Sequence, residues 1–216
     1  MNKTLKKIIE EYTTGRISGA KLFIRPLSES VHYGLAWPEP GEEVAHSGIV
    51  NPRILYFIMQ DASPVGAVEL LEANLDCFMF PVYRKKGIFS KAMKSVILPH
   101  ILQQKPLQRL QIGRSEHNER KFEVLKKIFV SLGFVILRED SELRMVIDAS
   151  RKPVGRFIAG DNKALSAERK DSMRKEFLWI AYRLTLIRSE LELQEGISYL
   201  SEDIGEIIKR LSAHGL

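Results

Sequence analysis

Cysteine is almost absent from this chain, which has one, Cys77, in 216 residues. A single thiol excludes an intramolecular disulfide and any metal cluster built from several cysteines, and it fits a reducing compartment. Long apolar runs are absent too, because none reaches the roughly 20 residues that a membrane helix requires. The first residues are basic but lack the continuous apolar core and small-residue cleavage site of a secretory signal. We therefore expect a cytoplasmic protein without membrane spans.

Acidic side chains are missing between Asp76 and Glu116, a window that holds eight Lys or Arg residues. The formal net charge of the whole chain is +6. Residues 150–216 hold 12 basic and 10 acidic side chains, so this part contributes only +2. The positive charge is therefore concentrated at one place rather than spread over a binding face, which argues against nucleic acid as a partner.

The composition changes near residue 150, where a stretch containing proline and glycine begins. Residues 1–149, with a core over about 20–148, alternate between strand-like and helix-like apolar periods, which predicts an α/β (α+β) domain. Residues 150–216 are expected to form a linker and a C-terminal helical pair. The expected strands cover residues 22–25, 53–60, 65–71, 75–82, 107–112, 134–137 and 143–147, and the expected helices cover 2–14, 90–103, 119–132, 165–193 and 198–213.

Two regions of the chain are harder to assign: one has no regular apolar period, and the other consists of helices whose packing partner the sequence does not determine. Residues 28–51 are rich in proline, glycine, serine and acidic side chains, so we expect a loop or a short helix there. Each of the two C-terminal helices is expected to have one apolar stripe and one charged face. Such a stripe must be buried against the body of the protein or against a second subunit, as in a homodimer.

The stretch from Pro81 to Lys91 is the strongest candidate for a binding site. An apolar run from Cys77 to Val82 ends at a basic loop with one glycine, Gly87, and an amphipathic segment follows at once. A strand, a glycine turn and a helix start together point backbone N–H groups and the positive end of a helix dipole at an anion. The sequence therefore predicts a pyrophosphate or polyphosphate site.

The order of elements and two motifs resemble the GNAT superfamily of acyl-CoA-dependent N-acetyltransferases over about residues 20–148. The family's pyrophosphate signature is Arg or Gln, two residues, Gly, one residue, and then Gly or Ala. Here it reads Arg84-Lys-Lys-Gly87-Ile-Phe89, with a phenylalanine in the final position. The family's second motif, a loop asparagine before a helix that ends in Gly-Phe, looks like Asn118 through Gly133-Phe134.

The resemblance implies a fold, a cofactor and a set of contacts. The fold is a mixed, mostly antiparallel sheet flanked by helices and opened between its fourth and fifth strands, with acetyl-CoA bound in the opening. The pyrophosphate would meet the amides of Lys85, Lys86, Gly87, Ile88, Phe89 and Ser90, with cationic attraction from Arg84, Lys85 and Lys86. The pantetheine arm would meet the backbone of Met79 and Phe80, and the side chain of Asn118.

The expected reaction is the direct transfer of an acetyl group from acetyl-CoA to an amine of unknown identity. The nearest carboxylates that could accept the proton of the amine are Glu69 and Glu72, with Asp76 beside them, and we favour Glu72 because a base in the family often lies early on the fourth strand. The tyrosine that often serves as general acid in the family is replaced by Phe129. Two alternatives therefore stay open: a non-catalytic acyl-CoA-binding or interaction protein, and a transferase of a longer acyl group.

Other reactive residue types do not assemble into a site. His46, His100 and His117 lie far apart and lack metal-ligand spacing, so we expect no metal. Cys77 alternates within an apolar strand and is expected to be buried packing rather than a nucleophile.

Overall fold

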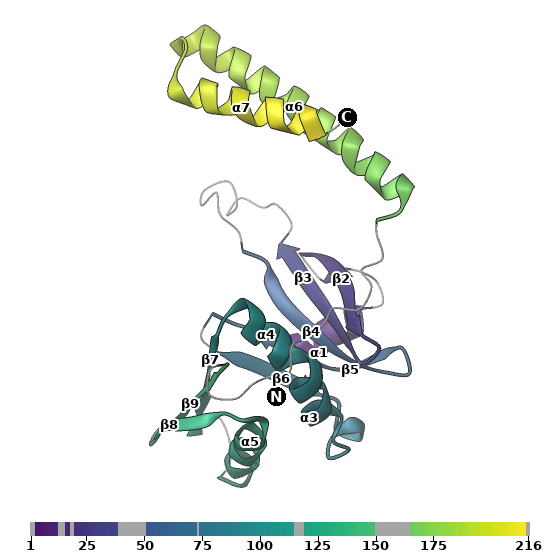
Figure 1. The fold of residues 1–216 in the computed structure, drawn as a ribbon, viewed down its shortest axis with the longest axis vertical. Coiled ribbons are helices and arrows are strands. Elements are labelled where there is room, and N and C mark those ends of the chain that lie inside the picture. Colours follow the sequence, from purple (N-terminus) through teal and green to yellow (C-terminus); the bar gives the residue numbers. More distant parts are fainter. Residues whose placement is uncertain are drawn as a thin grey trace. The chain divides into compact units, whose positions relative to one another are not determined.

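The strands of the first part of the chain form two antiparallel sheets (Figure 1). The computed structural model describes residues 3–12, 16–17, 20–38, 51–72, 74–114, 119–149 and 165–214. The chain divides into two compact units, Met1–Gly160 and Asp161–Leu216. The first unit is of the α+β class, and each unit is described by itself below.

The larger sheet has six strands that follow one another in sequence order. They are β1 (Arg16–Ile17), β2 (Ala20–Ser28), β3 (Val31–Pro38), β4 (Arg53–Gln60), β5 (Ser63–Leu70) and β6 (Leu75–Met79). The smaller sheet has the order β7-β9-β8, with β7 at Leu107–Gly113, β8 at Val135–Glu139 and β9 at Glu142–Asp148. The described strands thus divide between β6 and β7, where the sequence predicted an opening.

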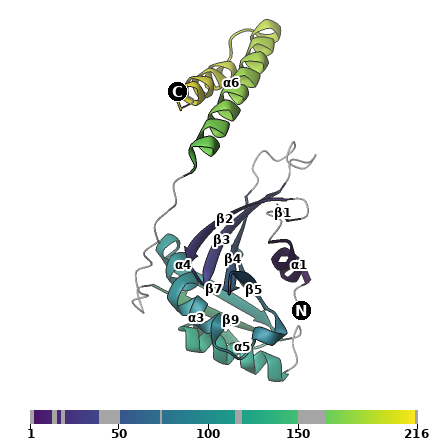
Figure 2. The same ribbon diagram turned by 90° about the vertical axis from the view of Figure 1, so that its right-hand side faces the viewer.

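Helices cover both faces of the larger sheet (Figure 2). The helix α1 (Lys3–Glu11) lies on one face, where Leu5, Ile8 and Ile9 pack against the sheet. A helix over residues 88–104 lies on the other face. Strand β4 contributes alternate side chains to both layers, with Phe57 toward α1 and Tyr56 toward the opposite helix. The strand is therefore apolar from Ile54 to Met59, because both of its faces are buried there.

The helix over residues 88–104 widens in its middle. It begins as α3 (Ile88–Ala92), passes through a π-helical turn (Met93–Ile97) and continues as α4 (Leu98–Gln104). Pro99 is the second residue after the wide turn. A proline has no N–H to donate and its ring crowds the carbonyl four residues earlier, so a local widening relieves the conflict without ending the helix.

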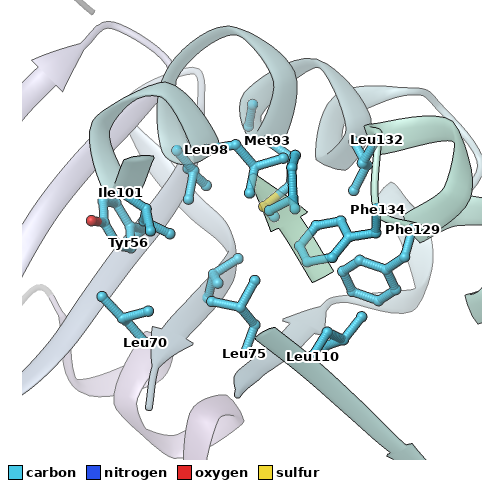
Figure 3. Packing of buried hydrophobic residues seen from close by; sticks show 14 of the residues in the cluster. Tyr56, Leu70, Leu75, Met93, Leu98, Ile101, Leu110, Phe129, Leu132 and Phe134 are labelled. Atoms are coloured by element: carbon cyan, nitrogen blue, oxygen red, sulfur yellow. The ribbon is translucent and has the colours of Figure 1, made fainter. Parts of the chain in front are cut away.

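The smaller sheet is covered by α5 (Glu119–Leu132). Phe129 and Phe134 meet edge to face, with their ring centroids 5.4 Å apart, and pack in the same cluster as Leu110 and Leu132 (Figure 3). The left-handed cap predicted at Gly133 is confirmed, because its φ is +104°. The Phe134 N–H donates to the carbonyl of Phe129 at 3.1 Å, which completes a Schellman motif.

The outer strand of the smaller sheet, β8, is exposed along its whole length. Its apolar residues Val135, Ile136 and Leu137 all face solvent in part. The pairing with β9 shifts register between Ile136 and Arg138. A bulge of this kind increases the local twist of an edge strand.

Two sequence predictions for the larger sheet are wrong. Residues 31–38, expected to be a loop or short helix, form β3, and the first strand is longer than 22–25 because it continues past Pro26 to Ser28. Strand β3 contains Gly34 at a position where strands usually have a larger residue. The ring of Phe57 fills the space of its side chain, because an added Cβ would lie 2.9 Å from that ring. The remaining residues of that expected loop, 39–50, lie outside the described residues.

The second unit is a helical hairpin of α6 (Ala167–Glu195) and α7 (Tyr199–His214). Ser166 caps α6, because its side-chain oxygen accepts a hydrogen bond from the Arg169 N–H. Figure 1 shows α7 lying along the C-terminal part of α6, while the N-terminal part of α6 continues beyond it. The prediction of a single apolar stripe on α6 is wrong, because Trp179, Tyr182 and Leu193 are large and exposed and lie outside it. The predicted stripe consisted of Phe177, Ile180, Ala181, Leu184, Ile187 and Leu191.

A buried histidine makes the stability of the first unit depend on pH. The Tyr56 hydroxyl lies 3.0 Å from Nδ1 of His100, and the ring of Tyr33 lies 5.2 Å from the imidazole. Burial lowers the pKa of His100 below its ordinary value, and the charge of Arg25 lowers it further. Because the unfolded chain then binds more protons than the folded one as the pH falls below about 6.5, stability falls with it.

We expect the melting temperature of the wild-type chain to decrease from pH 7.5 to pH 5.5, and we expect His100→Gln to reduce that decrease. Thermal unfolding followed by circular dichroism at the two pH values measures both. His32, whose pKa is also lowered by burial, contributes to the remaining pH dependence, so His32→Gln is the matched comparison. An unchanged pH dependence in His100→Gln would contradict this assignment.

Candidate functional site

The free edge of β6 is the first component of the candidate site. Among the strands that the structure describes, β6 pairs only with β5. The Phe80 N–H donates to the carbonyl of Val65 at 3.1 Å, and Gly66 lies opposite Met79. Because hydrogen-bonded and non-hydrogen-bonded pairs alternate along an antiparallel ladder, the N–H and C=O of Met79 point away from β5, toward the free edge.

This alternation separates the two strand residues that the sequence assigned to the pantetheine arm. The N–H of Phe80 is committed to β5, and its carbonyl accepts a hydrogen bond from the Tyr83 N–H at 3.0 Å. Met79 offers its N–H at the edge, while its carbonyl accepts a hydrogen bond from Nε of Arg84 at 2.9 Å. Of the two residues, Met79 is therefore the one whose amide can meet a ligand.

The side chain of Asn74 joins the two sheets at the start of β6. Its Nδ2 donates to the carbonyl of Gln111 at 3.2 Å, and its Oδ1 accepts from the Gln111 N–H at 3.0 Å. The same Oδ1 accepts from the Leu75 N–H at 2.9 Å. One amide side chain thus imitates a backbone ladder between β6 and β7. The free edge of β6 runs from this join to Met79, five residues or about 17 Å at the usual rise per residue.

The loop after β6 has an unusual backbone. A single 3-10 turn, Pro81–Tyr83, leads into it, and Arg84 is held to the strand end through Met79. Gly87 has a φ of +75°, and Lys85, which is not a glycine, has a φ of +61°. Left-handed residues alternating with ordinary ones turn successive N–H groups toward the same side, which forms a concave anion site. A left-handed conformation at a lysine is uncommon and is associated with functional loops.

The start of α3 presents backbone N–H groups without partners in the helix. Gly87 is the N-cap, no side chain caps the helix, and the first turn contains no acidic residue. The first intrahelical hydrogen bond runs from the Lys91 N–H to the carbonyl of Gly87 at 2.9 Å. The N–H groups of Ile88, Phe89 and Ser90 therefore have no acceptor within the helix, and the helix dipole favours a negative charge in front of them.

Two lysine side chains accompany these amides. Lys85 and Lys86 are exposed, and Nζ of Lys86 lies 5.5 Å from the centre of the Tyr83 ring. Arg114, also within the acid-free window, is bound instead to Glu119 and to Glu139 on β8. The loop cations are thus separated from the ion pairs around α5, and they remain available to an anion.

Glu69, one of the two candidate bases, is held in an ion pair. Nε of Arg53 donates to Oε1 of Glu69 at 2.7 Å, and Nη2 donates to Oε2 at 2.9 Å. The pKa of Arg53 is raised by this hydrogen bond and by the charges of Glu69 and Asp76, against the opposing effect of burial. With both oxygens engaged, Glu69 is poorly placed to take a proton from a substrate, and the ion pair favours a structural role.

Breaking this pair is expected to destabilise the first unit. Arg53→Met leaves the buried carboxylate of Glu69 without its partner, and we expect a loss of about 2 kcal/mol, less than for a fully buried pair because Arg53 is partly exposed. The double variant Arg53→Met/Glu69→Leu should recover most of the loss, because no charge is then left unpaired. Urea unfolding followed by circular dichroism measures both. Equal losses in the single and double variants would contradict the structural role.

Glu72, the favoured base, lies in the turn between β5 and β6. Its side chain is exposed, and the turn is closed by the Leu71 N–H donating to the carbonyl of Asn74 at 3.0 Å. Glu72 therefore lies at the end of β6 opposite to Met79. It can act only on a group that reaches the Asn74 end of the strand.

The remaining sequence predictions concern Cys77, Phe129 and Asn118. Cys77 packs against the core, and burial together with the charge of Asp76 raises the pKa of its thiol, which fits packing rather than nucleophilic chemistry. Phe129 is buried in the core of the smaller sheet. Asn118 lies outside the described residues. The bridging side chain of Asn74 and the left-handed backbone of Lys85 were missed in the sequence analysis. For Asn74 the only indication in the sequence was its place just before the strand that begins at Leu75.

No protein-family model matches this sequence, and a search of curated proteins finds no match. Within the described ranges, no three His, Cys, Asp or Glu side chains come together in a way that could hold a metal ion. The described helices include none that is both long enough and apolar enough to cross a membrane.

Proposed function

We propose that this protein is a GNAT-like N-acetyltransferase that binds acetyl-CoA along the free edge of β6 and transfers its acetyl group to an amine. The observation that carries the proposal is one coincidence at the end of β6. An outward-facing Met79 amide, a loop with left-handed Lys85 and Gly87, and an uncapped helix start lie in sequence at the same strand end. Such a group of donors suits a pyrophosphate with an extended, amide-containing arm.

Two groups of residues would hold the two parts of the cofactor. The N–H groups of Ile88, Phe89 and Ser90, with the side chains of Lys85 and Lys86, would hold the pyrophosphate. The edge of β6 would hold the pantetheine arm, as an added strand is held by an open sheet edge. An arm extended along this edge brings its thioester toward the Asn74 end, which is the end nearer Glu72. Acetyl-CoA supplies the activated acetyl group, and the protein supplies orientation of the two reactants.

Proton transfer requires a base for the amine and an acid for the departing thiolate. The attacking amine must lose a proton, and Glu72, directly or through water, is the exposed carboxylate available at that end of β6. The departing thiolate receives no proton from residue 129, because a phenyl ring has none to give. This absence favours the second candidate function, a non-catalytic acyl-CoA-binding protein of the same fold. A transferase of a longer acyl group is the third.

Calorimetric titration and a turnover assay separate these candidates. We expect acetyl-CoA and CoA to bind, and we expect pantetheine, which lacks the pyrophosphate, to bind at least tenfold more weakly. Release of free CoA thiol with a panel of primary amines, tested with acetyl-, butyryl- and palmitoyl-CoA, identifies the transferred group. Binding without turnover of any acyl-CoA would support the binding protein. Failure of both CoA and acetyl-CoA to bind would contradict all three functions.

A further inference from the structure

The helix α6 has two apolar faces, and only one of them is covered within its own unit. Ala181 is buried, and Leu184, Arg188 and Leu191 follow it at helical spacing as half-buried side chains. This face meets α7, because a Cβ on Gly205 would lie 3.0 Å from Nη1 of Arg188. The contact identifies the covered face.

The second face carries larger side chains and is open. At about 100° per residue, Trp179 and Leu186 lie roughly 160–180° around the helix from Arg188. Trp179 is 63% exposed, Tyr182 is 61% exposed and Leu193 is 85% exposed. Together with Leu178 and Leu186 they form what we call the open stripe of α6. The positions 179, 182, 186 and 193 are spaced by three, four and seven residues, as in a coiled-coil seam whose remaining position is Ser189.

The size of the open stripe fits a specific interface. At about 200 Å² for each large apolar side chain, its five members leave on the order of 600 Å² exposed. Two such stripes facing each other bury roughly 1,200 Å², the lower bound of stable protein–protein interfaces, before any polar rim is counted. A patch of this size is at the upper end of what a monomer exposes, where apolar patches often have a function.

The charges along α6 favour a second copy of the same helix in the opposite direction. Residues 167–183 hold five basic and three acidic side chains, whereas residues 184–195 hold one basic and three acidic. Antiparallel pairing sets the positive half of each helix against the negative half of the other, and parallel pairing would set like charges together. In this orientation the centres of the two open stripes can meet, with Tyr182 of each chain at the level of Leu186 of the other.

We propose that two copies of this chain associate through the open stripe of α6, with the two helices antiparallel and the two hairpins forming a four-helix assembly. This association does not depend on the proposed acetyl transfer. Each α6 is then covered on both apolar faces, by its own α7 on one side and by the partner's α6 on the other.

Sedimentation of the full-length chain tests the association. The wild-type protein should sediment at twice the chain mass of 24.7 kDa. Trp179→Glu/Leu186→Glu should weaken dimerisation by about 100-fold or more, because two charges at the centre of an interface lose their water on pairing. Tyr199→Glu/Ile207→Glu adds the same charge at exposed positions of α7 and should remain a dimer. Circular dichroism must show unchanged helix content in both variants.

Cross-linking tests the orientation. In a Cys77→Ala background, Lys175→Cys/Leu193→Cys should form an intermolecular disulfide, and Lys175→Cys alone should not. Efficient cross-linking of Lys175→Cys alone would mean parallel pairing and would overturn the proposal. A wild-type chain that stays monomeric at high concentration would overturn it as well. If that monomer binds anionic lipid vesicles with a blue shift of Trp179 emission, the open stripe belongs to a membrane surface instead.

Discussion

Reversal of the charges of Lys85 and Lys86 together is expected to weaken acetyl-CoA binding by about 100-fold, because two attractive contacts with the pyrophosphate become repulsive ones at short range. The amides of the loop remain in place in Lys85→Glu/Lys86→Glu, so some binding should survive. Calorimetric titration at two salt concentrations measures the effect. The wild-type protein should lose more affinity with added salt than the variant, because its charge contribution is screened.

The matched control reverses two other cations of the acid-free window. Lys105 and Arg109 are exposed near the far end of α4 and on β7, away from the loop. Lys105→Glu/Arg109→Glu changes the net charge by the same amount and should reduce affinity only a few-fold, through the long-range field. Equal losses in the two double variants would mean that net charge, not the loop, attracts the cofactor. Unchanged affinity in the loop variant would contradict the pyrophosphate assignment.

Among the substitutions proposed for the first unit, Gly66→Ala is expected to reduce its stability most. Gly66 lies opposite Met79 in the β5–β6 ladder. An added Cβ would lie 2.1 Å from Sδ of Met79 and 2.7 Å from the carbonyl oxygen of Phe78. The sulfur can move, but the backbone of β6 can yield only by moving away from β5. We expect Gly66→Ala to reduce the free energy of unfolding by about 3 kcal/mol, as overpacking at a buried site does.

The same substitution should also weaken acetyl-CoA binding, because it displaces the strand end that carries Met79 and, through Arg84, the loop. Urea unfolding followed by Trp37 emission in a Trp179→Phe background measures the stability of the first unit, and calorimetry measures the affinity. Gly205→Ala in α7 is the control, since the added Cβ meets only the flexible side chain of Arg188 in α6. A folded Gly66→Ala protein with wild-type affinity would contradict the contribution of β6 to the site.

The periodic elements could be predicted from the sequence because their signals are local. The helix over 88–104, the helix that ends at Gly133 and the loop at Gly87 all follow from residues adjacent in the chain. Strand β3 could not be predicted in this way. Its Gly34 is small because the ring of Phe57, on the next strand, occupies the space that a side chain would need. The size of one residue was thus determined by another that is distant in sequence.

The ion pair of Glu69 and the second apolar stripe of α6 could not be predicted from the sequence, for similar reasons. Glu69 resembled a free carboxylate because its partner, Arg53, is on a neighbouring strand and no spacing rule connects the two. The second stripe of α6 was missed because a search for one apolar stripe with a charged opposite face cannot describe a helix that is apolar on two sides. In each case the missing information is which surfaces meet.

The irregular pairing of β8 has a consequence for the behaviour of the protein in concentrated solution. An outer strand with three exposed apolar residues in a row is a template for uncontrolled β-sheet growth, and aggregating segments usually need five to seven such residues. Here the register shift after Ile136 distorts the strand, and the charged residues Arg138 and Glu139 end its apolar run at Leu137. The apolar edge is too short and too twisted to propagate, so the smaller sheet can leave it uncovered without converting the protein into a fibril former.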